Sequence, residues 1–307
     1  MRGLALASVV LNVVIIMTGS TVRLTESGLG CPSWPRCTGD SLVPVPGAGS
    51  STLHMVIEFG NRLVALPVFA VALACLLVAL RLGGRRQLVL LASLQTVGIV
   101  TQAVVGAVSV YAKLDPVPVA THFLLSMGVL ATAMALYVRA SEGDAPPRAT
   151  VPPNVRLLRR ALAGTVFVLL LVGTLVTGSG PHAGDASAPR LPFSIEAVAR
   201  VHSAAAWLTV ALTVALLVAL RSTNAPGTVR RRTYELLALE LAQGAIGYIQ
   251  YLAGIPEPLV AVHILGATLT WIATLRVLFA MRERGQAEAT TTADADATPR
   301  RSVKELR

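Results

Sequence analysis

Charged residues are scarce in this chain. Lys, Arg, Asp and Glu make up only 14% of its 307 residues, whereas soluble globular domains carry about 25%. This composition argues against an ordinary water-soluble enzyme. Apolar residues make up 54% of the chain, and a run of about 18 or more of them predicts a transmembrane helix. We therefore expect an all-α membrane protein.

Eight apolar runs have a length that suits a bilayer. They lie at residues 4–22, 53–80, 87–110, 116–138, 160–179, 197–220, 232–252 and 257–281. The first run is long and no small-residue cleavage motif follows it, so we expect a membrane helix there rather than a removed signal sequence. The sequence thus predicts eight transmembrane helices.

Acidic residues are scarcer than basic ones, 16 against 26, which leaves a formal net charge of +10. The arginines gather in the loops 81–86, 139–160 and 221–232. The alternate loops hold only Arg23, Arg36, Lys113 and Arg190. This alternation follows the positive-inside rule of membrane proteins, so we expect contact with the lipid bilayer and no nucleic-acid partner. It predicts a multi-pass protein of the cell (plasma) membrane with both termini cytoplasmic.

Cysteine occurs only three times. Cys31 and Cys37 fall in the first outer loop, which this orientation places in an oxidising compartment where disulfides persist. The prolines between them favour a turn that could bring the thiols together. A disulfide is our preferred interpretation, with free thiols or a redox-active pair as alternatives. Cys75 lies within a predicted helix, and we expect it to be a small core residue.

The second half of the chain repeats the first at an offset of 141 residues. The aligned pairs are Gln102 with Gln243, Gly106 with Gly247, His122 with His263, and Asn61 with His202. An even number of helices in each half gives both halves the same orientation. We therefore predict two tandem, pseudo-symmetric four-helix bundles, at 1–138 and 159–281. A linker at 139–158 joins them, and a polar tail at 282–307 is expected to be disordered and cytoplasmic.

Histidines are few, yet most lie at repeated positions. His202 and His263 fall at matching depth on two helices of the second half, and ionisable groups in membrane helices usually mark function. Two imidazoles that face each other in a helix bundle can hold a heme iron axially. Small residues beside them would admit a flat macrocycle. The alternative is that these small residues only permit close helix packing.

The first half holds one clear counterpart, His122, because Asn61 stands where the repeat expects its mate. His54 and Glu58 share a helix face with Asn61, seven and three residues earlier. Arg62 follows Glu58 at i+4, so a buried ion pair without chemistry is the alternative to a catalytic carboxylate.

One more membrane carboxylate stands apart. Glu240 has no charged counterpart, because the position 141 residues earlier is Ile99. Arg276 is the partner that we expect for it.

Several blocks together resemble the heme A synthase family. They are "GLGCPSWPRC" after "TGSTVRLTESG", "IEFGNRL", "ATHFLLS", "RVHSAAAW" and "VHILGA". The resemblance implies an oxidoreductase that converts heme O to heme A. A porphyrin methyl group is hydroxylated twice, and the gem-diol loses water to leave a formyl group. Implied partners are heme O synthase and cytochrome oxidase assembly factors.

The resemblance also implies roles for single residues. His202 and His263 would hold a heme b cofactor. The first half, with His122, Arg62 and the region around Asn61, would take the substrate heme, and Glu58 would act in the chemistry. Asn61 departs from the family, because many members have histidine there; His54 is an alternative ligand.

Two other classes of protein compete with this interpretation. A di-heme b-type electron carrier would explain both ligand clusters, but not Glu58 in one half only, since the equivalent residue is Ala199. A transporter built on parallel repeats would place its polar residues near the bilayer midplane, whereas here they gather toward the outer side.

Overall fold

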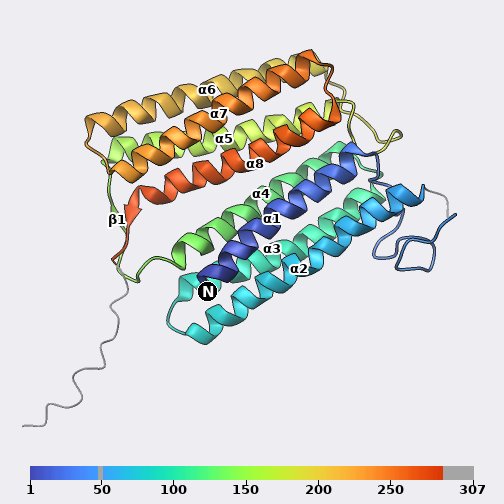
Figure 1. Ribbon diagram of the computed structural model, residues 1–307, viewed down its shortest axis with the longest axis horizontal. Helices are drawn as coiled ribbons and strands as arrows, with labels where there is room; N and C mark the ends of the chain where they lie inside the picture. Colours follow the sequence, from blue (N-terminus) through green and yellow to red (C-terminus); the bar gives the residue numbers. More distant parts are fainter. Residues whose placement is uncertain (48–50, 286–307) are drawn as a thin grey trace, which may run out of the picture.

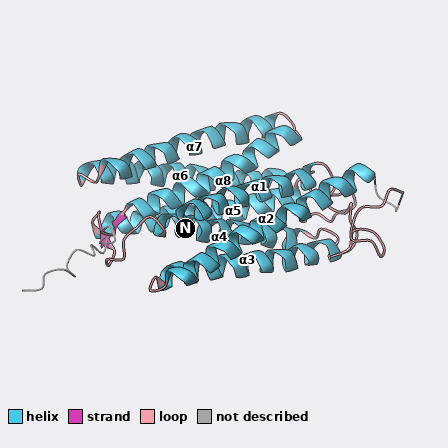
Figure 2. Cartoon of the chain, turned by 60° about the horizontal axis from the view of Figure 1, so that its bottom comes forward, coloured by secondary structure: helices cyan, strands magenta, loops and turns pink. Residues whose placement is uncertain are grey.

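The computed structural model describes residues 1–47 and 51–285, which form eight long helices that run side by side (Figure 1). Their bounds are α1 Arg2–Leu24, α2 Thr52–Leu82, α3 Arg86–Tyr111, α4 Pro116–Arg139, α5 Pro153–Ser179, α6 Ile195–Ser222, α7 Gly227–Leu252 and α8 Glu257–Ala280. Figure 2 shows that helices make up nearly all of the described chain. The predicted all-α class is confirmed.

Seven of these helices are long and apolar enough to cross a membrane, so the chain is a multi-pass membrane protein. The exception is α7, which carries Arg230, Arg231, Arg232, Glu235 and Glu240 together with two glutamines and three tyrosines. These polar residues lower the hydropathy of α7 below that of the other seven helices. It is nevertheless as long as they are and lies against both α6 and α8 (Figure 1).

Capping residues set several helix starts. Asp115 precedes α4 and its side chain accepts a hydrogen bond from the Val117 N–H, while Pro116 fills the first helical position. Likewise, α5 begins at Pro153, seven residues before the apolar run at 160–179 from which this helix was predicted. Proline is favoured at a first helical position because the N–H that it lacks would have no partner there. The polar first turns of α5 therefore extend the helix beyond its apolar part.

The first four helices meet the last four along a seam made by α1, α4, α5 and α8 (Figure 1). Trp271 of α8 donates its indole N–H to the carbonyl oxygen of Met127 in α4, at 3.0 Å. Its ring also lies beside Phe167 of α5, with 6.4 Å between ring centroids. Met127 and Leu130 are fully buried in the largest apolar cluster, which joins both halves. The halves thus pack into one body.

The arginine-rich end of the molecule is held together by ion pairs. Arg139 of α4 donates to Asp144 at 2.6 Å, and Arg85 donates to the same carboxylate at 2.9 Å. These two hydrogen bonds hold the pKa of Asp144 below its ordinary value.

A short antiparallel pair of strands closes the same end: β1 Arg148–Ala149 pairs with β2 Arg282–Glu283. The prediction that the disordered tail begins at residue 282 is wrong for residues 282–283. They pair with the linker because the end of α8 lies next to it. Residues 286–307 of that predicted tail lie outside the described residues.

The opposite end carries the loop between α1 and α2. Cys31 and Cys37 form a disulfide within it, which confirms the preferred interpretation. Both cysteines are fully buried and pack against Met55 and Phe59 of α2. Cys75 is a buried free thiol within α2, as predicted.

We expect Cys31 and Cys37 to resist a maleimide in the denatured protein until a reductant is added. A bridge across a sequence separation of 6 should stabilise the fold by about 2 kcal/mol, because it removes freedom from the unfolded chain. Mass spectrometry of the labelled protein measures this, and buried Cys75 serves as an internal control that reacts only after denaturation. Ready labelling of both cysteines without reductant would contradict the prediction.

Candidate functional site

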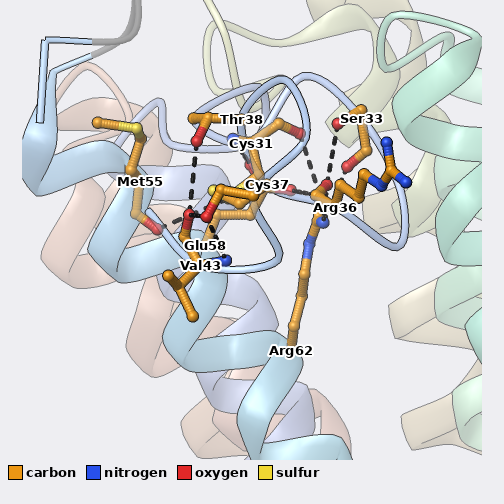
Figure 3. The surroundings of a disulfide bond; sticks show 10 residues. Cys31, Ser33, Arg36, Cys37, Thr38, Val43, Met55, Glu58 and Arg62 are labelled. Atoms are coloured by element: carbon orange, nitrogen blue, oxygen red, sulfur yellow. Dashed lines mark hydrogen bonds and ion pairs between the residues drawn. A yellow bond between two sulfur atoms is a disulfide. The ribbon is translucent and has the colours of Figure 1, made fainter. Parts of the chain in front are cut away.

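Glu58 joins the disulfide loop to helix α2 (Figure 3). The side chain is buried, with 5% of its surface exposed. Its Oε2 accepts a hydrogen bond from the Cys31 N–H at 2.6 Å, and its Oε1 accepts one from Arg62 at 2.5 Å. Hydrogen bonds to a charged group are the strong ones, so this carboxylate fixes the loop over the end of α2.

Arg62 is bound to the same loop through three backbone carbonyl groups (Figure 3). It donates to the oxygens of Ser33, Arg36 and Cys31 at 2.9, 3.2 and 3.0 Å. The ion pair with Glu58 that the sequence suggested is present. The sequence did not suggest that Glu58 and Arg62 also hold the loop. They bind backbone N–H and carbonyl groups of the loop, which every residue type can offer.

Asn61 lies one turn further into the membrane on α2. Its Oδ1 accepts a hydrogen bond from the Thr18 hydroxyl of α1 at 2.7 Å. A side-chain carbon at Gly19 would lie 3.9 Å from the same amide oxygen. The structure therefore places Asn61 against α1, with its oxygen already engaged.

His54 lies in the first turn of α2, directly under the loop. A Cβ atom at Gly30 would lie 2.6 Å from the His54 carbonyl group, so the loop reaches this turn only because residue 30 is a glycine. His54 is half-buried. The described contacts of this turn are thus with the loop, and they do not bring His54 together with His122.

The predicted repeat recurs in the contacts of two histidines. Gln102 donates to the carbonyl oxygen of His122 at 3.1 Å, and Gln243 donates to that of His263 at 2.6 Å. The imidazole edges face Gly106 and Gly247, where a Cβ would lie 3.4 and 3.2 Å away. The same three-residue arrangement of Gln, Gly and His thus occurs on α3–α4 and on α7–α8.

Glycine also faces the remaining repeated position on α2 and α6. A Cβ atom at Gly173 of α5 would lie 3.3 Å from the His202 ring, and one at Gly19 of α1 would lie 3.9 Å from the Asn61 amide oxygen. These two glycines are 154 residues apart rather than 141. The ungapped alignment could not find them, because the loops that follow α1 and α5 differ in length.

His202 and His263 face each other across the last four helices. Their ring centroids are 6.3 Å apart, and the rings are inclined by 63°. A metal–imidazole bond is about 2 Å long, and each bound nitrogen lies about 1.2 Å from the centre of its ring. Two imidazoles on opposite sides of one metal ion would therefore have ring centroids about 6.4 Å apart. The two imidazoles thus have the separation that two ligands of one metal ion would need.

Two further observations bear on what these histidines hold. Nδ1 of His122 and Nδ1 of His263 are buried, and neither has a hydrogen-bond partner among residues 1–47 and 51–285. The same part of the chain contains no cluster of three or more His, Cys, Asp or Glu residues suited to a bare metal ion. A pair of facing imidazoles between helices fits heme better than a site made of protein ligands alone.

Glu240 is buried in α7 but does not pair with Arg276. Its Oε1 accepts a hydrogen bond from Thr213 of α6 at 2.9 Å. Arg276 instead lies 3.2 Å from Glu235, so the predicted pairing is wrong. Arg276 belongs to the arginine-rich end, where Glu235 is one turn nearer than Glu240.

Comparison with known proteins places this architecture in a family. Residues 2–275 match the family model COX15-CtaA, cytochrome oxidase assembly protein. One relative is the heme A synthase of Azorhizobium caulinodans, 28% identical over 86% of this chain and 89% of its own length. Another is the heme A synthase of Lysinibacillus sphaericus, 32% identical over 57% of this chain and 56% of its own length.

Several matches are partial. The chain spans about half the length of most of the curated relatives that it matches. A protoheme IX farnesyltransferase of Haloarcula marismortui also matches, 29% identical over 46% of this chain and 30% of its own length. The family model, in contrast, covers nearly all of the described helices. The chain belongs to the COX15-CtaA family of cytochrome oxidase assembly proteins.

Proposed function

We propose that this chain is a heme A synthase, an oxidoreductase that converts a porphyrin methyl group of heme O into the formyl group of heme A. Two successive hydroxylations and the loss of water from the gem-diol would complete the reaction. The observation that carries the proposal is the pair of imidazoles, His202 and His263, set 6.3 Å apart inside the membrane. Family membership and the names of the relatives support it.

The second half holds the cofactor, heme b. His202 and His263 would hold it through Nε2, since Nδ1 of His263 is buried and the Nδ1 edges of the two rings face Gly173 and Gly247. When bound, heme b supplies one-electron redox chemistry. The glycines let α5 and α7 approach the imidazoles closely and hold their rings in orientation.

The first half takes heme O. His122 is its one strong ligand, because the Asn61 oxygen is engaged by Thr18. Ligation from one side favours release of the product, whereas a cofactor held from both sides stays bound. His54, under the loop, is the remaining candidate for the opposite face.

Glu58 acts on the substrate from the first half. Its carboxylate lies one turn above Asn61, where it can take up a proton released beside the porphyrin methyl group. Arg62 holds that carboxylate and the loop in place, so its role is one of positioning. The loop above the site keeps bulk water away.

The topology follows the charge pattern. The arginine-rich end, with both termini, faces the cytoplasm, and the disulfide end faces outward. α7 also crosses the membrane, which completes two pseudo-symmetric bundles at 1–138 and 159–281. The protein lies in the plasma membrane, where heme O synthase and oxidase assembly factors are its partners. The match to a protoheme IX farnesyltransferase supports a link to the first of these.

A di-heme b-type carrier is the competing function, and the repeated Gln, Gly and His contacts favour it. The type of heme in the purified protein distinguishes the synthase from the electron carrier. We expect the protein purified from cells that also express heme O synthase to contain heme A, and the protein from cells without it to contain only heme b. Heme extraction and mass analysis measure this, and heme b alone under both conditions would favour the carrier.

Replacement of the histidines should separate the two halves. We expect His202→Ala or His263→Ala to lose the tightly bound low-spin b-type heme, because neither axial ligand has a substitute nearby. His122→Ala should keep that heme and form no heme A. Visible spectra and a product assay measure this, with His182→Ala, a change in the loop after α5, as control. Loss of the low-spin heme in His122→Ala but not in His202→Ala would reverse the assignment of the halves.

Replacement of Glu58 tests its chemistry. We expect Glu58→Gln to keep heme b but to slow heme A formation by about 10²- to 10⁴-fold, the usual contribution of a general acid or base. Glu26→Gln, at an exposed carboxylate of the same end, is the matched control. Both variants should hold as much heme b as the wild type, which shows that the fold is intact. Near-normal activity of Glu58→Gln would leave Glu58 a purely structural ion pair.

A further inference from the structure

A small cavity opens between α6 and α7, on the edge of the molecule farthest from α1–α4 (Figure 1). Its volume is about 120 Å³, and its polar lining residues are Ser203, Trp207, Glu240 and Tyr248. Trp207 and Tyr248 are 59% and 49% exposed, so the cavity faces the surrounding lipid. We call it the α6–α7 cavity.

Three of these polar groups form one cluster. The Tyr248 hydroxyl lies 2.7 Å from the Ser203 hydroxyl, and it accepts a hydrogen bond from the Trp207 indole N–H at 3.1 Å. The cluster joins the two helices on their lipid-facing side. Because lipid tails offer no hydrogen bonds, a hydroxyl group there can serve a ligand that enters from the bilayer.

Glu240 lies about 12 Å along α7 from Tyr248, at eight residues and 1.5 Å per residue. It is 7% exposed. Oε1 is bound to Thr213, but Oε2 is buried without a hydrogen-bond partner in the described part of the chain. A buried polar atom without a partner is costly in an apolar medium. A ligand in the cavity could supply that partner.

Three of the polar lining residues are specific to the second half. Residues at the positions 141 earlier than Trp207, Glu240 and Tyr248 are Leu66, Ile99 and Ala107. The repeat therefore does not account for these polar residues, since three apolar side chains serve at the same places in the first half.

Size and polarity restrict the ligand. An apolar cavity of about 150 Å³ accommodates benzene. The α6–α7 cavity, at about 120 Å³, is somewhat smaller, so a six-membered ring fits only because the cavity is open on its lipid side, through which part of the ring and an attached chain extend. The described lining residues include no cation, which disfavours a lipid phosphate. The polar groups at the two ends suit a ring with an oxygen at each end.

We propose that the α6–α7 cavity binds the head group of an isoprenoid quinone, which accepts the electrons of the reaction. The Tyr248 hydroxyl donates to one quinone oxygen, and Glu240 supplies a proton to the other. The position of the cavity supports this, because Ser203 directly follows the heme ligand His202 in α6. This inference rests on the proposed function.

The electrons balance with two quinones. Oxidation of the methyl group with water gives a hydroxymethyl group, two protons and two electrons. A second oxidation with water gives the gem-diol, two more protons and two more electrons, and the gem-diol then loses water. Each quinone takes up two electrons and two protons to become a quinol. Two quinols should therefore form for each heme A.

Photo-crosslinking tests the binding site without any need for turnover. The probe is an azido-benzoquinone with a decyl chain, added to the heme-loaded protein in phospholipid nanodiscs. We expect saturable labelling of peptides from α6 and α7 that excess decyl-benzoquinone suppresses. Glu240→Gln and Tyr248→Phe should each lower labelling at a fixed probe concentration by about tenfold, which is the loss of one hydrogen bond of about 1.4 kcal/mol.

Glu235→Gln is the matched control, because Glu235 lies on the same helix outside the cavity and should label like the wild type. If Glu240→Gln fails to fold, Ser203→Ala, at a partly exposed position of the same cavity, takes its place and should likewise lower the labelling. Labelling spread without saturation over all lipid-facing helices, or unchanged in Glu240→Gln and Tyr248→Phe, would overturn the proposal.

Anaerobic turnover with the decyl-benzoquinone separates this inference from the proposed function. Heme A accompanied by two quinols supports both. Heme A formed at the same rate without any quinone would overturn the quinone site and leave the synthase intact. Specific crosslinking without any heme A, under all conditions, would support the site and contradict the synthase.

Discussion

The absence of water inside the bilayer is the constraint on which this structure depends. Each polar side chain within the helices must find a partner in the protein or in a ligand. Asn61 meets Thr18, and Gln102 meets the backbone of His122. Each of these bonds joins two helices, so the same groups that need partners also fix how the helices pack.

A described polar atom that lacks a partner and also lines a cavity indicates a place for a ligand. Oε2 of Glu240, in the α6–α7 cavity, is such an atom. In a soluble protein a water molecule could satisfy such an atom. Within a membrane the bilayer does not supply one readily, so a buried atom of this kind is a stronger sign of a ligand.

The helices, their number and the paired histidines could be predicted from the sequence, because each has a strong local signal. Apolar runs of sufficient length locate helices in a membrane protein. The offset of 141 residues aligned Gln243, Gly247 and His263 with their counterparts, and the structure shows the same contacts in both halves. The turns between α3 and α4 and between α7 and α8 have the same length, which keeps this alignment free of gaps.

The remaining features depend on loops, and their partners could not be read from the sequence. Gly173 faces His202, yet it is out of register with Gly19 because the loop after α1 is longer. Arg62 binds backbone carbonyls, which every residue possesses. Trp271 bonds to Met127 across the seam, and no repeat relates residues of the two halves that meet there.

The two halves differ in their chemistry at three repeated positions on α2 and α6. Glu58, Asn61 and Arg62 in α2 correspond to Ala199, His202 and Ser203 in α6.

In the first half the residue after the ligand position is Arg62, which reaches outward to the disulfide loop. In the second half it is Ser203, which reaches sideways to Tyr248 in the α6–α7 cavity. One helix therefore carries the carboxylate and the loop that suit a substrate. Its copy carries the second histidine that suits a permanent cofactor, and beside it an opening to the lipid. If the two halves are the pseudo-symmetric bundles proposed above, they would divide an oxidation in this way, with chemistry on the methyl group in one half and the exit of electrons in the other.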